Sequence, residues 1–208
     1  MKGHIAVEGH GDVEAVGNLV SRLSKDLSLD LLWDRPIRWK NLHQDKGIES
    51  VAEYTRRQSG VGALLILRDE DDGCPRERGP ESAAILRRLQ LPFPTAIVLF
   101  HREYEVLFLP CLPAMAGKQL GSGVAERPGI VPGATFTGDY EGLRGVKEWL
   151  SSQFPPGKSY KPTLDQAPLT RLIDFSMIRQ GNVPCFGTLE RALKFLSTSS
   201  AGVYPSAG

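Results

Sequence analysis

Two short apolar stretches of this chain each end abruptly in carboxylates and glycines. They are Ile5-Ala6-Val7-Glu8-Gly9-His10-Gly11-Asp12 and Leu64-Leu65-Ile66-Leu67-Arg68-Asp69-Glu70-Asp71-Asp72-Gly73. Carboxylates that crowd together repel one another unless a cation neutralises them. Their oxygens are hard ligands, which suit Mg²⁺ or Mn²⁺. We therefore predict an acidic site for a divalent metal, used on phosphate chemistry and formed by Glu8, Asp12, Asp69 and Asp71.

The elements that position these acids follow from hydrophobic periodicity. Continuous apolar runs predict strands that are buried on both faces of a sheet, at residues 4–8, 62–68 and 95–100, with a weaker strand within 30–40. Apolar positions keep helical spacing at residues 13–27, 48–57, 81–89, 143–154, 164–173 and 188–196. Buried strands joined by helices are usually parallel. The sequence thus predicts an α/β fold with a mainly parallel sheet flanked by helices, and its acids lie where such sheets bind ligands.

The chain is expected to form one domain in three parts. Residues 1–115 carry the catalytic core, and residues 116–196 add an irregular segment and a helical C-terminal part. Glycine and proline are dense near residues 117–140, which predicts an irregular insertion. Residues 197–208 are small and polar, which predicts a disordered tail.

Spacing within the acidic stretches suggests separate roles. Asp69 and Asp71 are two residues apart, so in an extended chain both side chains point the same way and suit one metal. Glu70 and Asp72 then point the other way and order the loop or meet solvent. Asp12 is also a natural N-cap for the helix that follows it. Residues 69–80 are expected to form a charged loop, and Thr188 is expected to cap the last helix.

Three further side chains are candidates for the site. Arg68 either clamps a phosphate or pairs with a carboxylate. His101 follows a predicted strand and could meet a phosphate or a leaving group, although the histidines as a set show no metal-ligand spacing. Glu105 is either an extra metal ligand or a residue that orients one.

Composition limits the possible settings. Of 208 residues, 41% are hydrophobic and 24% charged, as in ordinary globular proteins, and the net charge of +1 means that any binding of a polyanion must be local. The three cysteines form no Cys-x-x-Cys pair, which argues against a zinc ribbon or a disulfide framework and favours a reduced, cytoplasmic setting. No signal peptide is evident, and no apolar stretch approaches the ~20 residues that span a bilayer. We expect no membrane association.

Other phosphate-binding motifs fit poorly. Gly9-x-Gly11 follows a strand and precedes a helix, but the dinucleotide fingerprint needs Gly or Ala at position 14, where this chain has Glu14. No Gly-Lys-Ser/Thr follows the turn, which excludes a P-loop, and there is no Gly-x-Ser-x-Gly elbow.

The acidic motifs resemble those of the TOPRIM fold. Val7-Glu8-Gly9 closes the first strand and Asp69-Glu70-Asp71 closes a central one, as in the domain shared by topoisomerases, DnaG-type primases, RNA-maturation nucleases and overcoming-lysogenization-defect (OLD) nucleases. Asp12 fills the position of the second acid of the nuclease versions, although His10-Gly11 departs from their pattern. Residues 103–109 and 174–196 resemble stand-alone TOPRIM-like families found beside ABC-type or SMC-like ATPases, many in anti-phage islands.

The resemblance implies a metal-dependent nuclease acting on DNA or RNA in anti-phage defence, with an ATPase partner. Asp69 and Asp71 would hold the Mg²⁺ or Mn²⁺, Glu8 would be a ligand or general base, and Asp12 would hold a second ion. An alternative is a non-catalytic binding or regulatory module that docks on the ATPase. A phosphatase acting on a small substrate is a third possibility. The sequence leaves the oligomeric state open.

Overall fold

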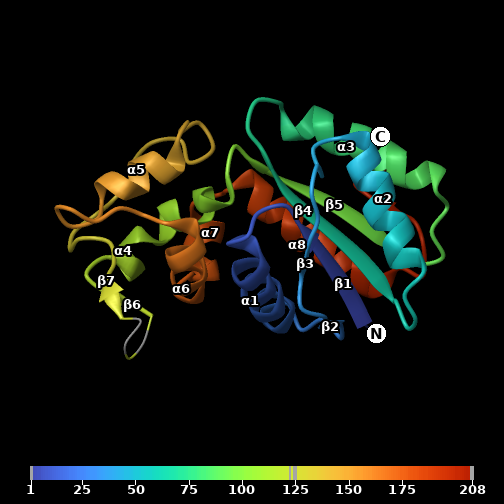
Figure 1. Cartoon of the computed structure of the whole chain (residues 1–208), viewed down its shortest axis with the longest axis horizontal. Coiled ribbons are helices and arrows are strands. Elements are labelled where there is room, and N and C mark those ends of the chain that lie inside the picture. Colours follow the sequence, from blue (N-terminus) through green and yellow to red (C-terminus); the bar gives the residue numbers. More distant parts are fainter. Residues whose placement is uncertain (1, 122, 124–125, 207–208) are drawn as a thin grey trace.

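A parallel sheet forms the centre of the computed structural model, which describes residues 2–121, 123 and 126–206. Its order is β2-β1-β4-β5-β8, with β3 also paired to β1, and all these pairs are parallel. The strands are β1 (Lys2–Val7), β2 (Leu32–Trp33), β3 (Ile37–Arg38), β4 (Ala63–Glu70), β5 (Thr95–His101) and β8 (Val203–Tyr204). Helices flank the sheet (Figure 1), so the predicted α/β fold is confirmed.

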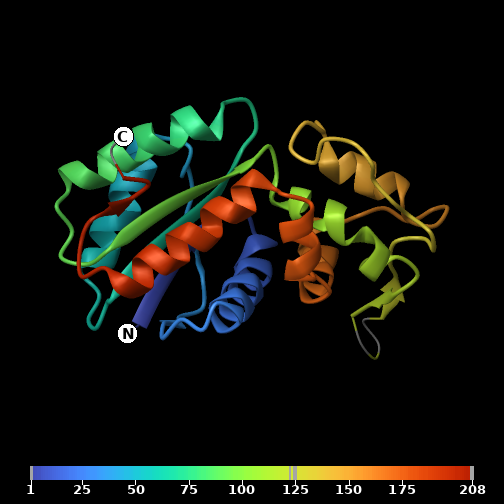
Figure 2. The same cartoon turned by 180° about the vertical axis from the view of Figure 1, so that it is seen from behind.

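Helices cover both faces of the sheet because alternate side chains of the central strands enter two separate apolar cores. Val7 and Leu65 belong to one core, and Ala6 and Ile66 belong to the other. The first core packs under α1 and α8, and the second packs under α2 and α3. These helices are α1 (Asp12–Asp26), α2 (Asp45–Arg56), α3 (Pro75–Arg88) and α8 (Pro184–Thr198). Figure 1 shows α2 in front of the sheet, and Figure 2 shows α8 crossing its other side.

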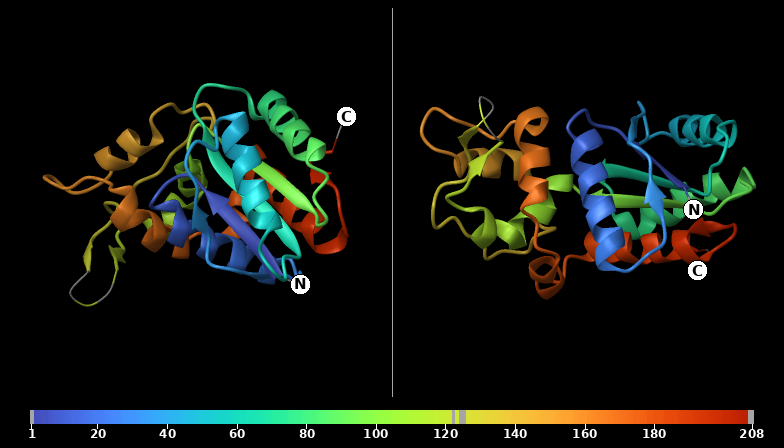
Figure 3. Two further views of the ribbon diagram at one scale, coloured as in Figure 1. Left: turned by 45° about the vertical axis from the view of Figure 1, so that its right-hand side comes forward. Right: turned by 90° about the horizontal axis from the view of Figure 1, so that it is seen from below.

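Residues 102–183, between β5 and α8, form a second region that we call the helical lobe. It contains η1 (Tyr104–Cys111), α4 (Leu112–Met115), β6 (Gln119–Leu120), β7 (Arg127–Pro128), α5 (Val146–Ser152), η3 (Pro162–Gln166), α6 (Ala167–Arg171) and α7 (Phe175–Gln180). The lobe lies beside the sheet and its helices (Figure 3), and its apolar core continues into the core under α1. Arg22 of α1 ties the two together by donating hydrogen bonds to the carbonyls of Thr170 and Ile173, at 2.8 and 2.6 Å.

The loop predicted at residues 69–80 is much shorter. Strand β4 continues through Asp69 to Glu70, and helix α3 begins at Pro75 instead of near residue 81. The glycines and prolines of this stretch predict a loop, but proline suits the first position of a helix, where its missing N–H costs no hydrogen bond. The acids at the end of β4 are therefore followed by a connection of only a few residues.

Two predicted helix caps are wrong. Gly11 occupies the N-cap of α1, and Asp12 is already helical, so its carboxylate is free for contacts elsewhere. Helix α8 begins at Pro184, and Thr188 lies inside it, where its hydroxyl donates a hydrogen bond to the Pro184 carbonyl at 3.0 Å. In both cases a residue type that favours the N-cap position lies inside the helix instead.

The regions predicted to lack regular structure differ from each other. The Gly/Pro-rich stretch near 117–140 carries only the short strands β6 and β7 among its described residues, and residues 122, 124 and 125 lie outside the described part. In place of a disordered tail at 197–208, α8 runs to Thr198 and β8 pairs with β5. Residues 207 and 208 lie outside the described part. None of the described helices is long and apolar enough to cross a membrane.

Candidate active site

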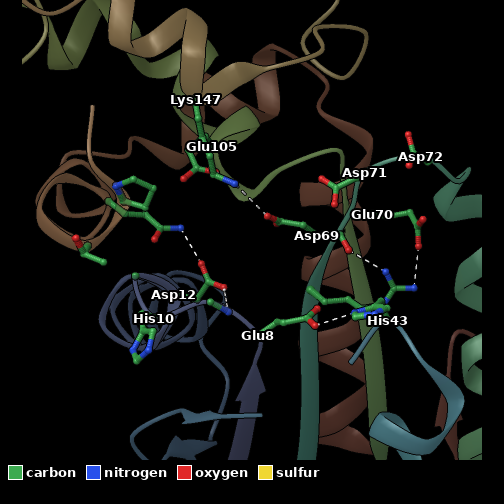
Figure 4. Close-up of a pocket in the computed structure, with 16 residues that line it drawn as sticks. Glu8, His10, Asp12, His43, Asp69, Glu70, Asp71, Asp72, Glu105 and Lys147 are labelled. Carbon is green, nitrogen blue, oxygen red and sulfur yellow. Dashed lines mark hydrogen bonds and ion pairs between the residues drawn. The ribbon is translucent and has the colours of Figure 1, made fainter. Parts of the chain in front are cut away.

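A pocket of about 560 Å³ lies at the carboxyl edge of the sheet, facing the helical lobe. Residues from the ends of β1 and β4, from the start of α1 and from the lobe line it: Glu8, Gly9, His10, Gly11, Asp12, His43, Arg68, Asp69, Glu70, Asp71, Asp72, Glu105, Lys147, Pro162, Thr163 and Gln166. Because β1 and β4 are neighbouring parallel strands, their carboxyl ends meet at one edge. All four of the acids predicted for the site therefore line one pocket (Figure 4).

Glu8 stands directly after β1 and is held by two contacts. His43 Nδ1 lies 2.9 Å from Glu8 Oε1, and Arg38 Nε donates a hydrogen bond to the Glu8 carbonyl at 3.1 Å. Arg38 also lies 2.7 Å from His10 Nε2. The Glu8 side chain is 32% exposed, so its carboxylate remains accessible from the pocket.

Asp12 uses both carboxylate oxygens within the protein. Its Oδ2 accepts a hydrogen bond from the Gly9 N–H, and its Oδ1 accepts one from Gln166 Nε2, both at 2.8 Å. Gln166 belongs to the helical lobe, so Asp12 links the turn between β1 and α1 to that lobe. A Cβ at Gly11 would collide with Gln166 Oε1 and come within 2.8 Å of the Pro162 carbonyl oxygen. Glycine at position 11 is what permits this close approach.

Asp69, the penultimate residue of β4, contacts the helical lobe with both carboxylate oxygens. Its Oδ1 accepts a hydrogen bond from the Tyr104 N–H at 2.8 Å, and its Oδ2 lies 3.4 Å from Lys147 Nζ. Burial, and then the negative charge of Glu105, raise the pKa of Asp69 well above its ordinary value, while Lys147 opposes the rise. A carboxyl with a raised pKa in a pocket is a common mark of a functional site.

Glu105 and Lys147 bring a second charged group to the pocket from the helical lobe. Glu105 is fully buried, and its Oε1 accepts a hydrogen bond from the Tyr160 hydroxyl at 2.8 Å. Lys147 Nζ lies 3.5 Å from Glu105 Oε2 and 3.0 Å from Glu103 Oε1. Burial raises the pKa of Glu105 to about 7, although Lys147 and Tyr160 lower it in part. Burial opposes the charge on Lys147, but the neighbouring carboxylates outweigh it and raise the Lys147 pKa.

Asp71 does not share the position of Asp69. Strand β4 ends at Glu70, so the alternation of an extended chain does not carry over to Asp71, which is exposed and lines the pocket from the loop. Its carbonyl accepts a hydrogen bond from Arg102 Nη1 at 2.7 Å. Glu70 has the loop-ordering role expected for it, because its Oε1 accepts a hydrogen bond from the Gly73 N–H at 3.0 Å.

The structure separates the remaining candidates. Arg68 pairs with a carboxylate, since its Nη2 lies 2.7 Å from Glu70 Oε2 and only 5% of its side chain is exposed. Glu105 reaches the pocket, as described above. His101 instead lies 3.6 Å from Glu141 Oε2 and lines a different cavity of about 680 Å³ between α3 and α8.

Four residues of the site were not predicted from the sequence: His43, Lys147, Tyr160 and Gln166. Lys147 lies 78 positions from Asp69, and Gln166 lies 154 positions from Asp12. No local motif marks them. Lys147 sits within a segment of helical spacing, where a lone lysine reads as a solvated surface residue.

The pocket offers the type of ligand atom that a hard cation prefers, although its side chains are not grouped around one point as in a complete metal site. Within residues 2–121, 123 and 126–206, no three His, Cys, Asp or Glu side chains are grouped so that they could hold a metal ion. The donors are nevertheless carboxylate oxygens, the type that Mg²⁺ and Mn²⁺ prefer. In the same described residues, Glu105 Oε2 is buried and accepts no hydrogen bond, so it has the capacity for a further positive partner.

Comparison of the chain with protein-family models, with curated proteins and with solved structures finds no match. Evidence about function therefore comes from the geometry of the site. That geometry consists of acids from separate parts of the chain, two of them with raised pKa values, around one pocket at the ligand-binding edge of a parallel sheet.

Proposed function

We propose that this protein is a metal-dependent nuclease that hydrolyses phosphodiester bonds in DNA or RNA. The observation that carries the proposal is the meeting of Glu8, Asp12, Asp69 and Glu105 in one pocket at the carboxyl edge of the sheet. Membership of the TOPRIM fold is part of the same proposal. It is supported by the position of Val7-Glu8-Gly9 and Asp69-Glu70-Asp71 at the ends of the neighbouring strands β1 and β4.

The proposal assigns a role to each acid. Asp69 would hold Mg²⁺ or Mn²⁺, with Glu105 and the exposed Asp71 as further ligands, and Glu8 would be a ligand or a general base. When bound, such an ion supplies an activated water and stabilises charge on the phosphate. Asp12 could hold a second ion only by giving up its hydrogen bond to Gly9 or Gln166.

The partner and biological function that we propose come from the resemblance of the acidic motifs to TOPRIM-like families. They are an ABC-type or SMC-like ATPase and a function in anti-phage defence. We also propose a cytoplasmic location, which the free thiols of Cys74, Cys111 and Cys185 support, because a reducing compartment keeps thiols unpaired.

The test is cleavage of plasmid, single-stranded DNA and RNA in Mg²⁺ or Mn²⁺, compared with EDTA. Wild type should cleave at least one substrate, and Asp69→Ala and Glu8→Ala should lose the activity. Asp72→Ala is the matched control, because Asp72 is exposed and pairs only loosely with Arg144, at 3.5 Å. If the wild type, Asp69→Ala and Glu8→Ala behave alike, the proposal that this pocket hydrolyses phosphodiester bonds is wrong.

A non-catalytic module that docks on an ATPase is the second candidate. One observation favours it: Lys147 already pairs with Asp69, Glu103 and Glu105, so the acids could serve to order the pocket. Titration calorimetry with Mn²⁺ separates the two functions. Absence of Mn²⁺ binding, together with a silent cleavage assay, would favour the docking module.

A further inference from the structure

The ammonium group of Lys147 contacts three carboxylates. Lys147 Nζ lies 3.0 Å from Glu103 Oε1, 3.4 Å from Asp69 Oδ2 and 3.5 Å from Glu105 Oε2. Glu105 is fully buried, and a buried carboxylate without a positive partner is strongly unfavourable. Lys147 therefore supplies the charge that lets these acids lie together in the metal-free protein.

The oxygens that face Lys147 are also the ones left over for a cation. The other oxygen of Asp69 accepts the Tyr104 N–H, and the other oxygen of Glu105 accepts the Tyr160 hydroxyl. This leaves Asp69 Oδ2 and Glu105 Oε2, and Figure 4 shows Lys147 pointing toward Asp69 from the Glu105 side of the pocket. A divalent cation at these two oxygens and the Lys147 ammonium cannot share the place, because like charges repel at such distances.

The attachment of Lys147 allows its ammonium to leave while its helix stays. The Lys147 N–H donates a hydrogen bond to Glu103 Oε2 at 3.0 Å, which fixes the start of α5 independently of the side chain. The side chain is 32% exposed and has four rotatable methylene groups, so its ammonium can turn toward solvent. Only a side-chain rotation is needed.

We propose that Lys147 is a built-in placeholder, whose ammonium fills the Asp69–Glu105 cation position in the metal-free protein and is expelled when a divalent cation binds there. The inference rests on the cation site of the proposed function and adds the oxygens involved and the group that must move. The resident ammonium lowers the apparent affinity for the cation, because part of the binding free energy is used to displace it.

The first experiment measures Mn²⁺ affinity by titration calorimetry for the wild type and for Lys147→Met. Removing the competitor leaves buried carboxylates unpaired, so Lys147→Met should bind Mn²⁺ about tenfold more tightly or better. Arg144→Met is the matched control, because it removes a positive charge from the exposed rim pair with Asp72 and should leave the affinity unchanged. Glu105→Gln should weaken binding in either background.

A second experiment uses the unaltered protein and so does not depend on how Lys147→Met folds. Amine-reactive labelling, read by mass spectrometry, reports how available each lysine is. Labelling of Lys147 should be slow in the metal-free protein and should rise severalfold on addition of Mn²⁺, while labelling of Lys158, outside the pocket, should not change.

The outcomes separate this inference from the proposed function. Tighter Mn²⁺ binding by Lys147→Met, with Mn²⁺-dependent labelling of Lys147, supports the placeholder even if no nucleic acid is cleaved. Equal or weaker Mn²⁺ binding by a folded Lys147→Met, with labelling that ignores Mn²⁺, overturns the placeholder even if cleavage depends on Asp69. Failure of all variants to bind Mn²⁺ overturns both.

Discussion

The two walls of the pocket are built in different ways. The sheet wall carries Glu8, directly after β1, and Asp69, near the end of β4, and the register of these neighbouring strands is fixed by a backbone ladder. The lobe wall carries Glu105, Lys147 and Gln166, which come from short or irregular elements and are fixed mainly by side-chain contacts. The sheet wall therefore depends on hydrogen bonds that every residue can form, and the lobe wall depends on particular side chains.

The two walls therefore have different roles: the sheet positions the acids, and the lobe influences their charge state. The sheet brings acids to a shared edge whatever their neighbours are. The lobe then modifies their charge state: burial raises the pKa of Asp69 most, the charge of Glu105 raises it further, and Lys147 lowers it. Substitutions in the sheet wall should mainly affect activity, and those in the lobe wall should affect stability, its pH dependence and cation affinity.

The largest effect is expected from Asp69→Asn. The substitution keeps the shape but removes the negative charge of the proposed principal ligand, so kcat/KM for cleavage in Mn²⁺ should fall about 10²- to 10³-fold. Asp71→Asn should lower it by less than about tenfold, because Asp71 lies beyond the end of β4 and is exposed. Equal damage from both variants would place the cation on the Asp69–Asp71 pair and remove Glu105 from the first set of ligands.

A large effect on stability is expected from Glu105→Gln, measured by urea unfolding in EDTA from pH 4.5 to 8. The pKa of Glu105 rises from 4.5 to about 7 on folding, so the native state holds the proton more tightly than the unfolded chain. The resulting stability is fully present below pH 4.5 and is lost as pH rises to about 7. Relative to the variant, the wild type should lose up to about 3 kcal/mol over this range. A difference that does not change with pH would show that Glu105 stays ionised.

A smaller effect is expected where the two walls are joined. Gln166→Ala removes the amide that donates to Asp12, and the unfolding free energy should fall by about 1–2 kcal/mol. Thr163→Ala, on the same π-helical turn but exposed, is the control and should change stability by less than about 0.5 kcal/mol. A double-mutant cycle with Asp12→Ala tests the contact, and fully additive losses would mean that Gln166 does not act through Asp12.

The smallest effect is expected for His43→Ala. His43 contacts Glu8 at 2.9 Å, but 54% of its side chain is exposed, so solvent screens the pair. Its removal should lower stability by about 0.5 kcal/mol or less and should change cleavage only slightly. Lys46→Ala, at an exposed neighbouring position, serves as the control. A loss of cleavage comparable to that of Asp69→Asn would instead give His43 a direct part in the chemistry.

Hydrophobic periodicity was sufficient to predict the central strands and most helices. Residues 63–67 and 96–100 are apolar without interruption, and a run of that kind is stable only when both faces of a strand are covered. The same pattern predicted acids at the carboxyl ends of β1 and β4. Because parallel strands share one carboxyl edge, the pattern predicts Glu8 and Asp69 at the same edge, and the pairing of β1 with β4 brings them into one pocket.

Local rules failed where another part of the chain decided the outcome. The i, i+2 spacing of Asp69 and Asp71 predicts a shared direction only while the strand continues, and β4 ends between them. Asp12 is a good N-cap by composition, but its carboxylate instead joins Gly9 to Gln166. The tail pairs with β5 because that strand offers a free edge, which the composition of the tail does not reveal.

The sheet, the helices that cover it and the acidic edge could thus be predicted from the amino-acid sequence, since each depends on periodicity or on the chain direction of adjacent strands. Which charged side chains meet depends instead on long-range packing. Lys147 reaches Asp69 across 78 positions, and Gln166 reaches Asp12 across 154. Such pairs depend on how the helical lobe packs against α1 and the sheet, and no periodicity within one segment encodes that packing.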